Sequence, residues 1–186
     1  STIIRAGMIS CTTQNINKST MDFPKEWKHT TNIYEVNVRQ YTEEGTFRAF
    51  EKEMPRLKAM GVKTLWFMPI TPIAQQNKKG SMGSPYAASD YVSINPEFGT
   101  MADFKHMVNA AHRLGFKVII DWVANHTGWD NVWTETHPEF YLKDSDGKFH
   151  IASGMDDIIE LDYKNQEMRK AMIDAMKFWV KETNID

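Results

Sequence analysis

The sequence predicts an α/β fold with a parallel sheet, and three observations support this prediction. Short apolar segments rich in β-branched residues alternate with longer segments whose apolar residues recur every three or four positions. These two periods are typical of strands and amphipathic helices. Two of the helical stripes end at a glycine, Gly61 and Gly115, and an apolar run follows each one. Repeated strand–helix units of this kind form parallel sheets with right-handed crossovers.

The first predicted unit is a strand, a helix and a second strand. Residues 32–38 show the alternation of a strand, and residues 46–60 carry a helical stripe. Pro55 lies inside this stripe and should bend the helix or divide it. Gly61 supplies the left-handed residue that commonly ends a helix. Residues 62–69 then form an apolar run, which predicts a strand buried on both faces.

The second predicted unit repeats this order. Residues 100–103 have the pattern of a capping box, and residues 104–114 carry the helical stripe. Residues 116–123 are again expected to be a strand buried on both faces. A third helix is expected over residues 165–183, with Asn165 as its cap. Most of the twelve methionines lie on these helical stripes, which favours a role as core filler.

Composition and charge exclude several classes of protein. The chain has 22 basic and 24 acidic residues, and the resulting net charge of −2 removes the electrostatic case for nucleic-acid binding. A single cysteine cannot form an internal disulfide, which excludes a disulfide-stapled mini-protein. No run approaches the roughly 18 apolar residues of a membrane helix, so no membrane span is expected.

The first 29 residues differ from the rest and are predicted to be a tether. Residues 10–20 are rich in Ser, Thr, Asn and Gln and show no period. The segment around Cys11 is similar to a bacterial lipoprotein processing site, which would give a lipid anchor and an extracytoplasmic location. The alternative is an unstructured N-terminus with a chance cysteine, because Arg5 interrupts the short apolar stretch.

Two long insertions interrupt the strand–helix rhythm. They span residues 71–99 and residues 127–164, and each follows the carboxyl end of a predicted strand. Long connections in compact domains usually have a function. Ligands of parallel α/β folds bind at that edge of the sheet. The functional residues are therefore expected on these two insertions and on the strand ends that lead into them.

Four polar or aromatic residues stand out at this edge. If the strand over 116–123 continues, Asp121 and Asn125 lie on one side and His126 lies at its tip. Such a group is costly in a plain core, although satisfying loop backbone groups is an equally weighted alternative. Tyr86, in the first insertion, offers a stacking face with a polar tip or, alternatively, a packing aromatic. Residues 144–147 resemble a calcium loop, but a hairpin turn is preferred because the bidentate Glu is missing.

Other chemistries lack their motifs in this sequence. No glycine-rich phosphate loop follows a predicted strand, the six histidines form no zinc pattern, and no nucleophilic serine elbow is present. A dinucleotide- or phosphate-binding barrel is thereby disfavoured.

Several phrases, taken in order, resemble the alpha-amylase family of glycoside hydrolases. The run Asp121-x-Val123-x-Asn125-His126 is similar to the first signature region of that family. It is preceded by Ser-Pro-Tyr-x-x-Ser-Asp-Tyr, Asn-Pro-x-Phe-Gly-Thr and His-x-x-Gly-x-Lys-Val-Ile-x-Asp. The resemblance implies the N-terminal part of a (β/α)₈ TIM barrel, with a small domain inserted after strand 3. Residues 30–126 would be the first part of the barrel, 127–163 the inserted domain, and 164–186 the third helix and the start of strand 4, where the barrel is truncated.

The resemblance also implies roles for individual residues. Tyr86 would stack on the sugar at the cleavage subsite, His126 would hydrogen-bond that sugar, and Asp121 would support the site. Asn125 resembles a ligand of a structural calcium ion, and Glu160 stands where an aspartate would contribute. Calcium accepts amide and carboxylate oxygens. No catalytic residue is expected within the segment, because the nucleophile and the acid/base of this family would follow Asp186.

The activity implied is retaining hydrolysis of α-1,4-glucosidic bonds in starch-like glucans or maltooligosaccharides. Gly83 stands where exo-acting α-glucosidases usually place an aspartate, and residues 160–162 look amylase-like, so both favour an open, endo-acting cleft. A cyclomaltodextrinase- or neopullulanase-like enzyme, a transglycosylating relative and a non-catalytic sugar-binding homologue are the alternatives. A complete (β/α)₈ domain takes ~250 residues, so the segment alone is expected to be inactive.

Overall fold

The computed structural model describes residues 26–152 and 154–186 of the chain. The chain divides into two units, residues 1–31 and Asn32–Asp186, and only residues 26–31 of the first unit are described. The first contributes one short 3₁₀ helix, Trp27–His29, to the described part. Cys11 and residues 1–25 of the predicted tether lie outside the described residues. The lipid anchor and the extracytoplasmic location therefore stay predictions.

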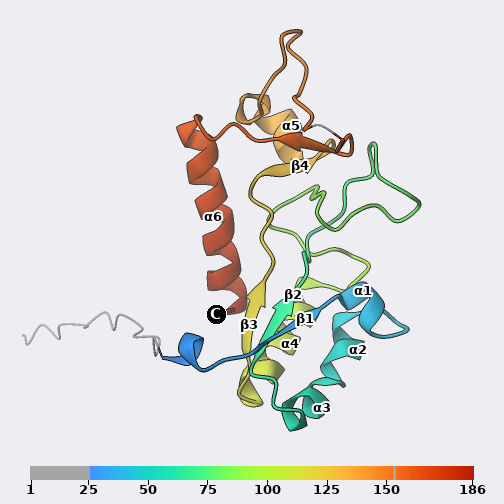
Figure 1. The fold of residues 1–186 in the computed structure, drawn as a ribbon, viewed down its shortest axis with the longest axis vertical. Coiled ribbons are helices and arrows are strands. Elements are labelled where there is room, and N and C mark those ends of the chain that lie inside the picture. Colours follow the sequence, from blue (N-terminus) through green and yellow to red (C-terminus); the bar gives the residue numbers. More distant parts are fainter. Residues whose placement is uncertain (1–25, 153) are drawn as a thin grey trace, which may run out of the picture. The chain divides into compact units, whose positions relative to one another are not determined.

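The second unit is built on a three-stranded parallel sheet, which confirms the predicted fold class (Figure 1). Its strands β1 (Ile33–Val36), β2 (Thr64–Phe67) and β3 (Lys117–Ile120) lie in the order β1-β2-β3. In the register, Tyr34 pairs with Leu65, and Leu65 pairs with Val118. Each strand is four residues long and therefore shorter than its apolar or alternating run in the sequence.

The two faces of the sheet are buried to different extents. Val36, Leu65 and Val118 are fully buried on one face, in a cluster that takes residues from every long helix. On the other face Ile33 is 59% exposed, and Ile119 is only half-buried. On this second face of β2, Thr64 is buried and Trp66 is half-buried, so the prediction of burial on both faces is confirmed in part for the second strand. It is wrong for the third strand, where Lys117 and Ile119 are only half-buried on this face. The reason is that the long helices of the described chain pack on the first face.

The helix predicted over residues 46–60 is divided in two. Helix α2 (Phe47–Glu51) begins after Thr46, whose hydroxyl accepts from the Ala49 N–H. Helix α3 (Met54–Ala59) has Pro55 in its first turn, where a proline lacks no needed hydrogen bond. The four-residue helix α1 (Val38–Tyr41) was not predicted from the sequence, because one turn is too short to show a helical stripe of apolar residues.

The two longer helices carry the caps that the sequence predicts. Helix α4 (Met101–Arg113) has a capping box in which Thr100 and Asp103 bond to each other's backbone N–H. Helix α6 (Gln166–Thr183) begins at Asn165, whose side chain accepts from the Met168 N–H. After this helix the Asp186 N–H donates to the Val118 carbonyl at the open edge of β3.

The methionines fit the core-filler prediction only in part. Met54, Met107, Met168 and Met172 are buried. Two others on the predicted stripes are largely exposed, Met60 at 62% and Met176 at 47%. Met60 follows the last residue of α3, and Met176 shares its exposed face of α6 with Ile173 and Val180. The prediction is therefore wrong for these two residues.

The second insertion forms a small structure of its own. We call residues 127–163 the lobe. An antiparallel pair, β4 (His126–Gly128) and β5 (Ile158–Glu160), lies beside the short helices α5 (Val132–Thr136) and Pro138–Phe140. The predicted hairpin turn over residues 144–147 is present, since the Asp144 N–H donates to the Lys148 carbonyl. Its flanks bridge at Lys143 and Phe149.

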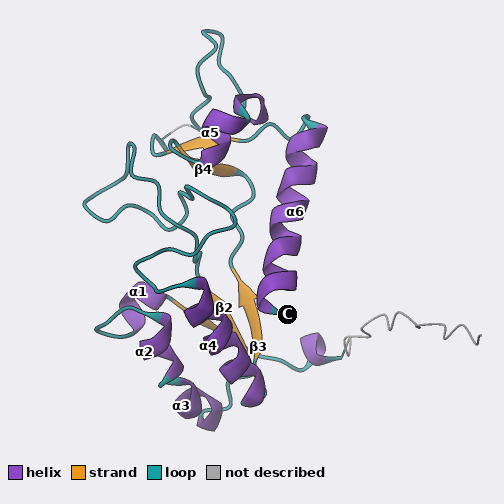
Figure 2. Ribbon diagram, turned by 180° about the vertical axis from the view of Figure 1, so that it is seen from behind, coloured by secondary structure: helices purple, strands orange, loops and turns teal. Residues whose placement is uncertain are grey.

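Helix α6 links the lobe to the sheet. Figure 2 shows it running alongside β3 up to the level of α5 and β4. Its Met168 and Met172 pack with Phe140 and Ile159 of the lobe, whereas its Trp179 belongs to the cluster under the sheet. One helix therefore borders both hydrophobic clusters.

Candidate functional site

The segment that carries the predicted site residues is not a continuation of the strand. β3 ends at Ile120, the Asp121 N–H makes the last bond to β2, and His126 begins β4. The expected alternation through Asn125 is therefore wrong. The hydroxyl of Tyr91 instead holds the crossing segment, since it donates to the carbonyl oxygens of Val123 at 2.7 Å and His126 at 3.1 Å.

The structure brings the three predicted substrate-binding residues together. The Tyr86 hydroxyl donates to the Asp121 carboxylate, with 3.2 Å between the oxygens. The backbone carbonyl of Tyr86 lies 3.2 Å from Nε2 of His126. The three residues thus form one connected group at the carboxyl end of the sheet. Their contacts with a sugar stay predictions.

Hydrogen bonding fixes the proton on the His126 ring. A carbonyl oxygen only accepts, so Nε2 must carry the proton that it donates to Tyr86. Nδ1 then accepts from the Asn125 amide at 3.3 Å. Burial lowers the pKa of His126 below its ordinary value of 6.5, and this outweighs the Tyr86 carbonyl and the nearby charges of Asp157 and Glu160. The ring is therefore a neutral N–H donor at neutral pH.

Tyr86 is held in its un-ionised form. Burial raises the pKa of its hydroxyl, and the negative charge of Asp121 together with the hydrogen bond to it raises that pKa further. The charge of Glu35 acts in the same direction. A neutral phenol beside a carboxylate keeps its proton, and the hydrogen bond to Asp121 holds the tip of the Tyr86 ring in place.

The two predicted calcium ligands lie close together, Asn125 directly before β4 and Glu160 at the end of the neighbouring β5. Glu160 pairs with His126 across β4 and β5, and the Asn125 carbonyl accepts from the Leu161 N–H at 3.1 Å. The Glu160 carboxylate accepts from Nδ1 of His150 at 2.8 Å. Within residues 26–152 and 154–186, no three His, Cys, Asp or Glu side chains cluster as a metal site would need. Asn125 and Glu160 fit a part of a calcium sphere, which takes six to eight oxygens.

A cavity of about 200 Å³ adjoins Tyr86. It lies between helix α1, the residues that follow β2 and the first insertion. Asn37, Arg39, Pro69 and Pro85 line it together with Tyr86. The predicted site therefore has a hollow beside it, formed by the ends of two adjacent parallel strands.

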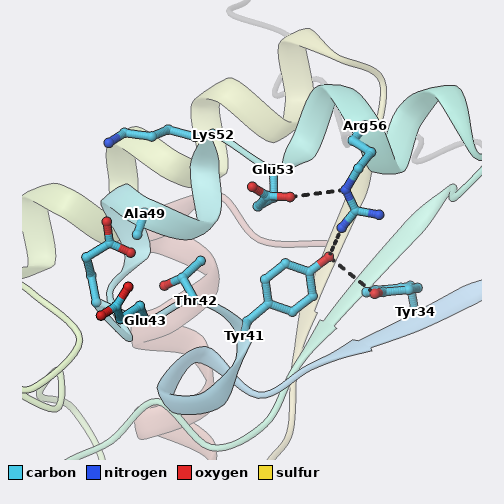
Figure 3. A pocket seen from close by; sticks show the side chains of 9 residues that line it. Tyr34, Tyr41, Thr42, Glu43, Ala49, Lys52, Glu53 and Arg56 are labelled. Atoms are coloured by element: carbon cyan, nitrogen blue, oxygen red, sulfur yellow. Dashed lines mark hydrogen bonds and ion pairs between the residues drawn. The ribbon is translucent and has the colours of Figure 1, made fainter.

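A larger cavity, of about 520 Å³, lies among α1, α2 and α3 and contains none of the predicted site residues (Figure 3). Arg56 donates to the Tyr41 hydroxyl at 2.7 Å and to Glu53 at 3.1 Å. Tyr34 lies 3.2 Å from the Tyr41 hydroxyl, and burial together with this contact raises the pKa of Tyr41 to about 12. These polar groups bond to one another, so we assign no ligand to this cavity.

Comparison with known proteins identifies the family of the chain. The model of the alpha-amylase catalytic domain matches residues 17–148. The chain belongs to the alpha-amylase family. Among solved structures of this family, an alpha-amylase from Lactobacillus plantarum superposes with a TM-score of 0.80 and 43% identity over 82% of this chain and 36% of its own. A noncanonic maltogenic alpha-amylase, AmyB from Thermotoga neapolitana, gives 0.80 and 41% over 84% and 37%.

A curated relative carries a different activity in its name. The malto-oligosyltrehalose trehalohydrolase of Deinococcus radiodurans is 33% identical over 83% of this chain and 24% of its own length. The chain thus spans between 24% and 37% of the length of these alpha-amylase-family relatives. No helix in residues 26–152 and 154–186 is long and apolar enough to span a bilayer.

Some residues that shape the site were not singled out from the sequence. Tyr91 belongs to the Ser-Asp-Tyr phrase that the alpha-amylase resemblance uses, yet its bonds to Val123 and His126 depend on residues more than 30 positions away. Glu35, on β1, raises the pKa of Tyr86 through its negative charge. A carboxylate on an otherwise apolar strand was the feature of the sequence that could have indicated this role.

Proposed function

We propose that this chain supplies part of the substrate site of an enzyme that hydrolyses α-1,4-glucosidic bonds in starch-like glucans or maltooligosaccharides. The observation that supports this most strongly is the connected group of Asp121, Tyr86 and His126 at the carboxyl end of parallel strands. Because the chain spans about a third of its relatives, the complete activity belongs to a longer polypeptide. We call that polypeptide the full-length protein.

The proposed site binds sugar by two complementary chemistries. The Tyr86 ring offers an apolar face, which suits the apolar face of a pyranose ring. His126 offers a neutral N–H donor, now bonded to the Tyr86 carbonyl, which a sugar hydroxyl would share. Asp121 already accepts from Tyr86, so its role is to hold that ring. Retaining hydrolysis needs two carboxylates about 5–5.5 Å apart, and we propose that these follow Asp186 in the full-length protein.

The substrate class is the finer part of the proposal. The two amylase structures are more similar to this chain, at 43% and 41% identity, than the trehalohydrolase at 33%. Together with Gly83 in the first insertion, this favours an open cleft that accepts internal bonds of long glucans. Product analysis of the full-length protein on starch, pullulan, cyclodextrin and malto-oligosyltrehalose tests this. Rapid loss of iodine-staining starch with α-anomeric products is expected, and no release of sugar from any of the four would contradict the proposal.

We also propose that Asn125 and Glu160 supply two of the ligands of a structural calcium ion that joins the lobe to the barrel. The contact between their segments, in which the Leu161 N–H donates to the Asn125 carbonyl, and their oxygen chemistry support this. Chelation of calcium should lower the melting temperature of the full-length protein, because a ligand that binds only the folded state stabilises it. The shift should be smaller in Asn125→Ala. Identical melting with and without chelator in the unmodified protein would contradict the metal site.

The role of His126 can be tested by truncation. In the full-length protein, His126→Ala should lower kcat/KM on soluble starch at least about tenfold, or about 1.4 kcal/mol of transition-state binding. His137→Ala is the control, because that exposed ring lies at the end of α5 and contacts Glu139. An unchanged kcat/KM in His126→Ala would refute its role in substrate binding.

A further inference from the structure

The two segments that border the proposed site are joined along one polar junction. We call residues 71–99 the first loop. The Gly128 N–H of the lobe donates to the Ala88 carbonyl of this loop at 3.0 Å, and the Val132 N–H donates to the Ser89 carbonyl at 3.0 Å. The buried side chain of Asn131 also donates to the Ala88 carbonyl, at 3.1 Å. The lobe is therefore paired with the first loop through the backbone.

Asp130 makes a second contact at this junction, with a different stretch of the first loop. Its Oδ2 accepts from two successive backbone N–H groups, those of Gln75 at 2.9 Å and Gln76 at 3.2 Å. Bonds from backbone N–H to a carboxylate are stronger than those between neutral groups. The turn continues through Asn77, which has a positive φ of 57°. A single exposed carboxylate thus fixes the start of this turn.

A chain of backbone contacts leads from Asp130 to the proposed site. Next to Gln75, the Ala74 N–H donates to the Ala87 carbonyl at 2.8 Å. Ala87 follows Tyr86, whose carbonyl lies 3.2 Å from Nε2 of His126. The first loop thus has two stretches, residues 74–76 and residues 86–89, which bond to each other through Ala74 and Ala87. Asp130 holds the first stretch to the lobe, and backbone hydrogen bonds hold the second. Movement of the stretch that contains Gln75 would therefore shift Tyr86 relative to His126.

We propose that Asp130 is a positioning residue, which sets the spacing between Tyr86 and His126 by fixing the first loop to the lobe. The inference rests on the proposed function, because it assumes that these two residues bind the sugar. Asp130 is exposed and does not fill the core, so its truncation leaves no cavity. Its effect should appear in substrate binding before it appears in the chemical step.

The test compares three variants of the full-length protein. Asp130→Ala removes the acceptor of both N–H groups, Asp130→Asn keeps an oxygen acceptor without the charge, and Asp146→Ala removes an exposed carboxylate on the hairpin turn of the same lobe. Asp130→Ala should raise KM for maltooligosaccharides about tenfold while kcat changes little, because Tyr86 and His126 would bind substrate and transition state alike. Asp130→Asn should recover most of this loss, and Asp146→Ala should match the unmodified protein.

Hydrogen exchange gives a readout that does not depend on activity. The peptide that contains Gln75 and Gln76 should exchange faster in Asp130→Ala than in Asp146→Ala, because both amides lose their acceptor. An active protein whose Asp130→Ala variant keeps a normal KM would overturn the inference, and so would a lower kcat with no change in KM. An unmodified full-length protein that releases no sugar would instead contradict the proposed function, while faster exchange in Asp130→Ala would still establish the junction.

Discussion

Two regions of the molecule are stabilised in different ways: the sheet with its helices, and the junction between the first loop and the lobe. Under the sheet, the Phe104 ring lies 5.1 Å from Phe47, 6.3 Å from Phe67 and 6.0 Å from Trp179, and all four are buried. Between the first loop and the lobe, Tyr91 packs against Trp133 with 4.9 Å between ring centroids. At the Gly128 end of this contact, the buried cluster is small (Ala74, Ala87 and Ile158), and backbone hydrogen bonds hold the two segments together there. Apolar packing is non-directional and tolerant, whereas these bonds require particular atoms in particular places. The stability of the molecule and the geometry of its site therefore depend on different residues.

Truncation of a ring under the sheet should have the largest effect on stability. Phe104→Ala should lower the free energy of unfolding by about 3–5 kcal/mol, because it leaves a cavity among three aromatic rings. Denaturant unfolding of the full-length protein measures this. Met82→Ala, at a 54% exposed position in the first loop, is the control and should change stability by less than about 0.5 kcal/mol. A similar loss in both variants would remove the distinction between the two regions.

A methyl group added at the junction should have a moderate effect. A Cβ at position 128 would lie 2.0 Å from Cβ of Ala74 and 3.3 Å from the Ala87 carbonyl. Gly128→Ala should therefore cost about 1–3 kcal/mol of stability and should also raise KM, since the lobe must move away from the first loop. Differential scanning calorimetry and steady-state kinetics of the full-length protein measure the two effects.

Gly147→Ala is the matched control in the same lobe. Its φ is +76° and no atom lies within 4 Å of the added Cβ, so it carries backbone strain of about 1 kcal/mol without a steric clash. It should leave KM unchanged. A raised KM in both variants would mean that the lobe responds to strain at any point rather than to contact with the first loop.

The smallest expected effect is a loss of thermal stability at acid pH, caused by protonation of Asp103 in the capping box of α4. The Arg48 guanidinium, bonded at 2.8 Å, and the Thr100 N–H and hydroxyl lower the pKa of Asp103 from 3.8 to about 2. Because the folded-state pKa lies below the ordinary value, this contribution is complete above 3.8 and is lost as the pH falls toward 2. The melting temperature of the unmodified protein should therefore fall more steeply over this range than that of Asp103→Asn. Parallel curves would show that the capping box contributes nothing that depends on pH.

The sheet and helices could largely be predicted because their signals are local. The caps of α4 and α6, the division at Pro55 and the apolar runs of β2 and β3 are each contained within a few consecutive residues. The failures have physical causes. Met60 and Met176 keep the helical period but lie at exposed positions, 62% and 47% exposed. The prediction that the strand continues through Asn125 was wrong, because the Tyr91 hydroxyl, and not a neighbouring strand, bonds to the carbonyl oxygens of Val123 and His126.

The residues of the site could be singled out from their places in the chain, but their roles came from the resemblance to a family. Tyr86, Asp121 and His126 lie on the first insertion and at the end of a predicted strand, and the order of the alpha-amylase phrases assigned them to sugar binding. The structure places Asp121 and His126 each within hydrogen-bond distance of Tyr86. Asp130 carries no such signal, because its partners Gln75 and Gln76 lie more than 50 positions away and contribute only backbone N–H groups. A contact to a backbone amide leaves no pattern in the side chains of the partner segment.

The tight approach of Gly128 to Ala74 also has a consequence for recombination between relatives. A chimera that received a foreign lobe alone would set new side chains against an old first loop, at a place where a single added methyl group would overlap with Ala74. The carboxylate of Asp130 would likewise meet a turn that was not shaped for it. Residues 71–99 and 127–163 should therefore be exchanged together when such a chimera is built.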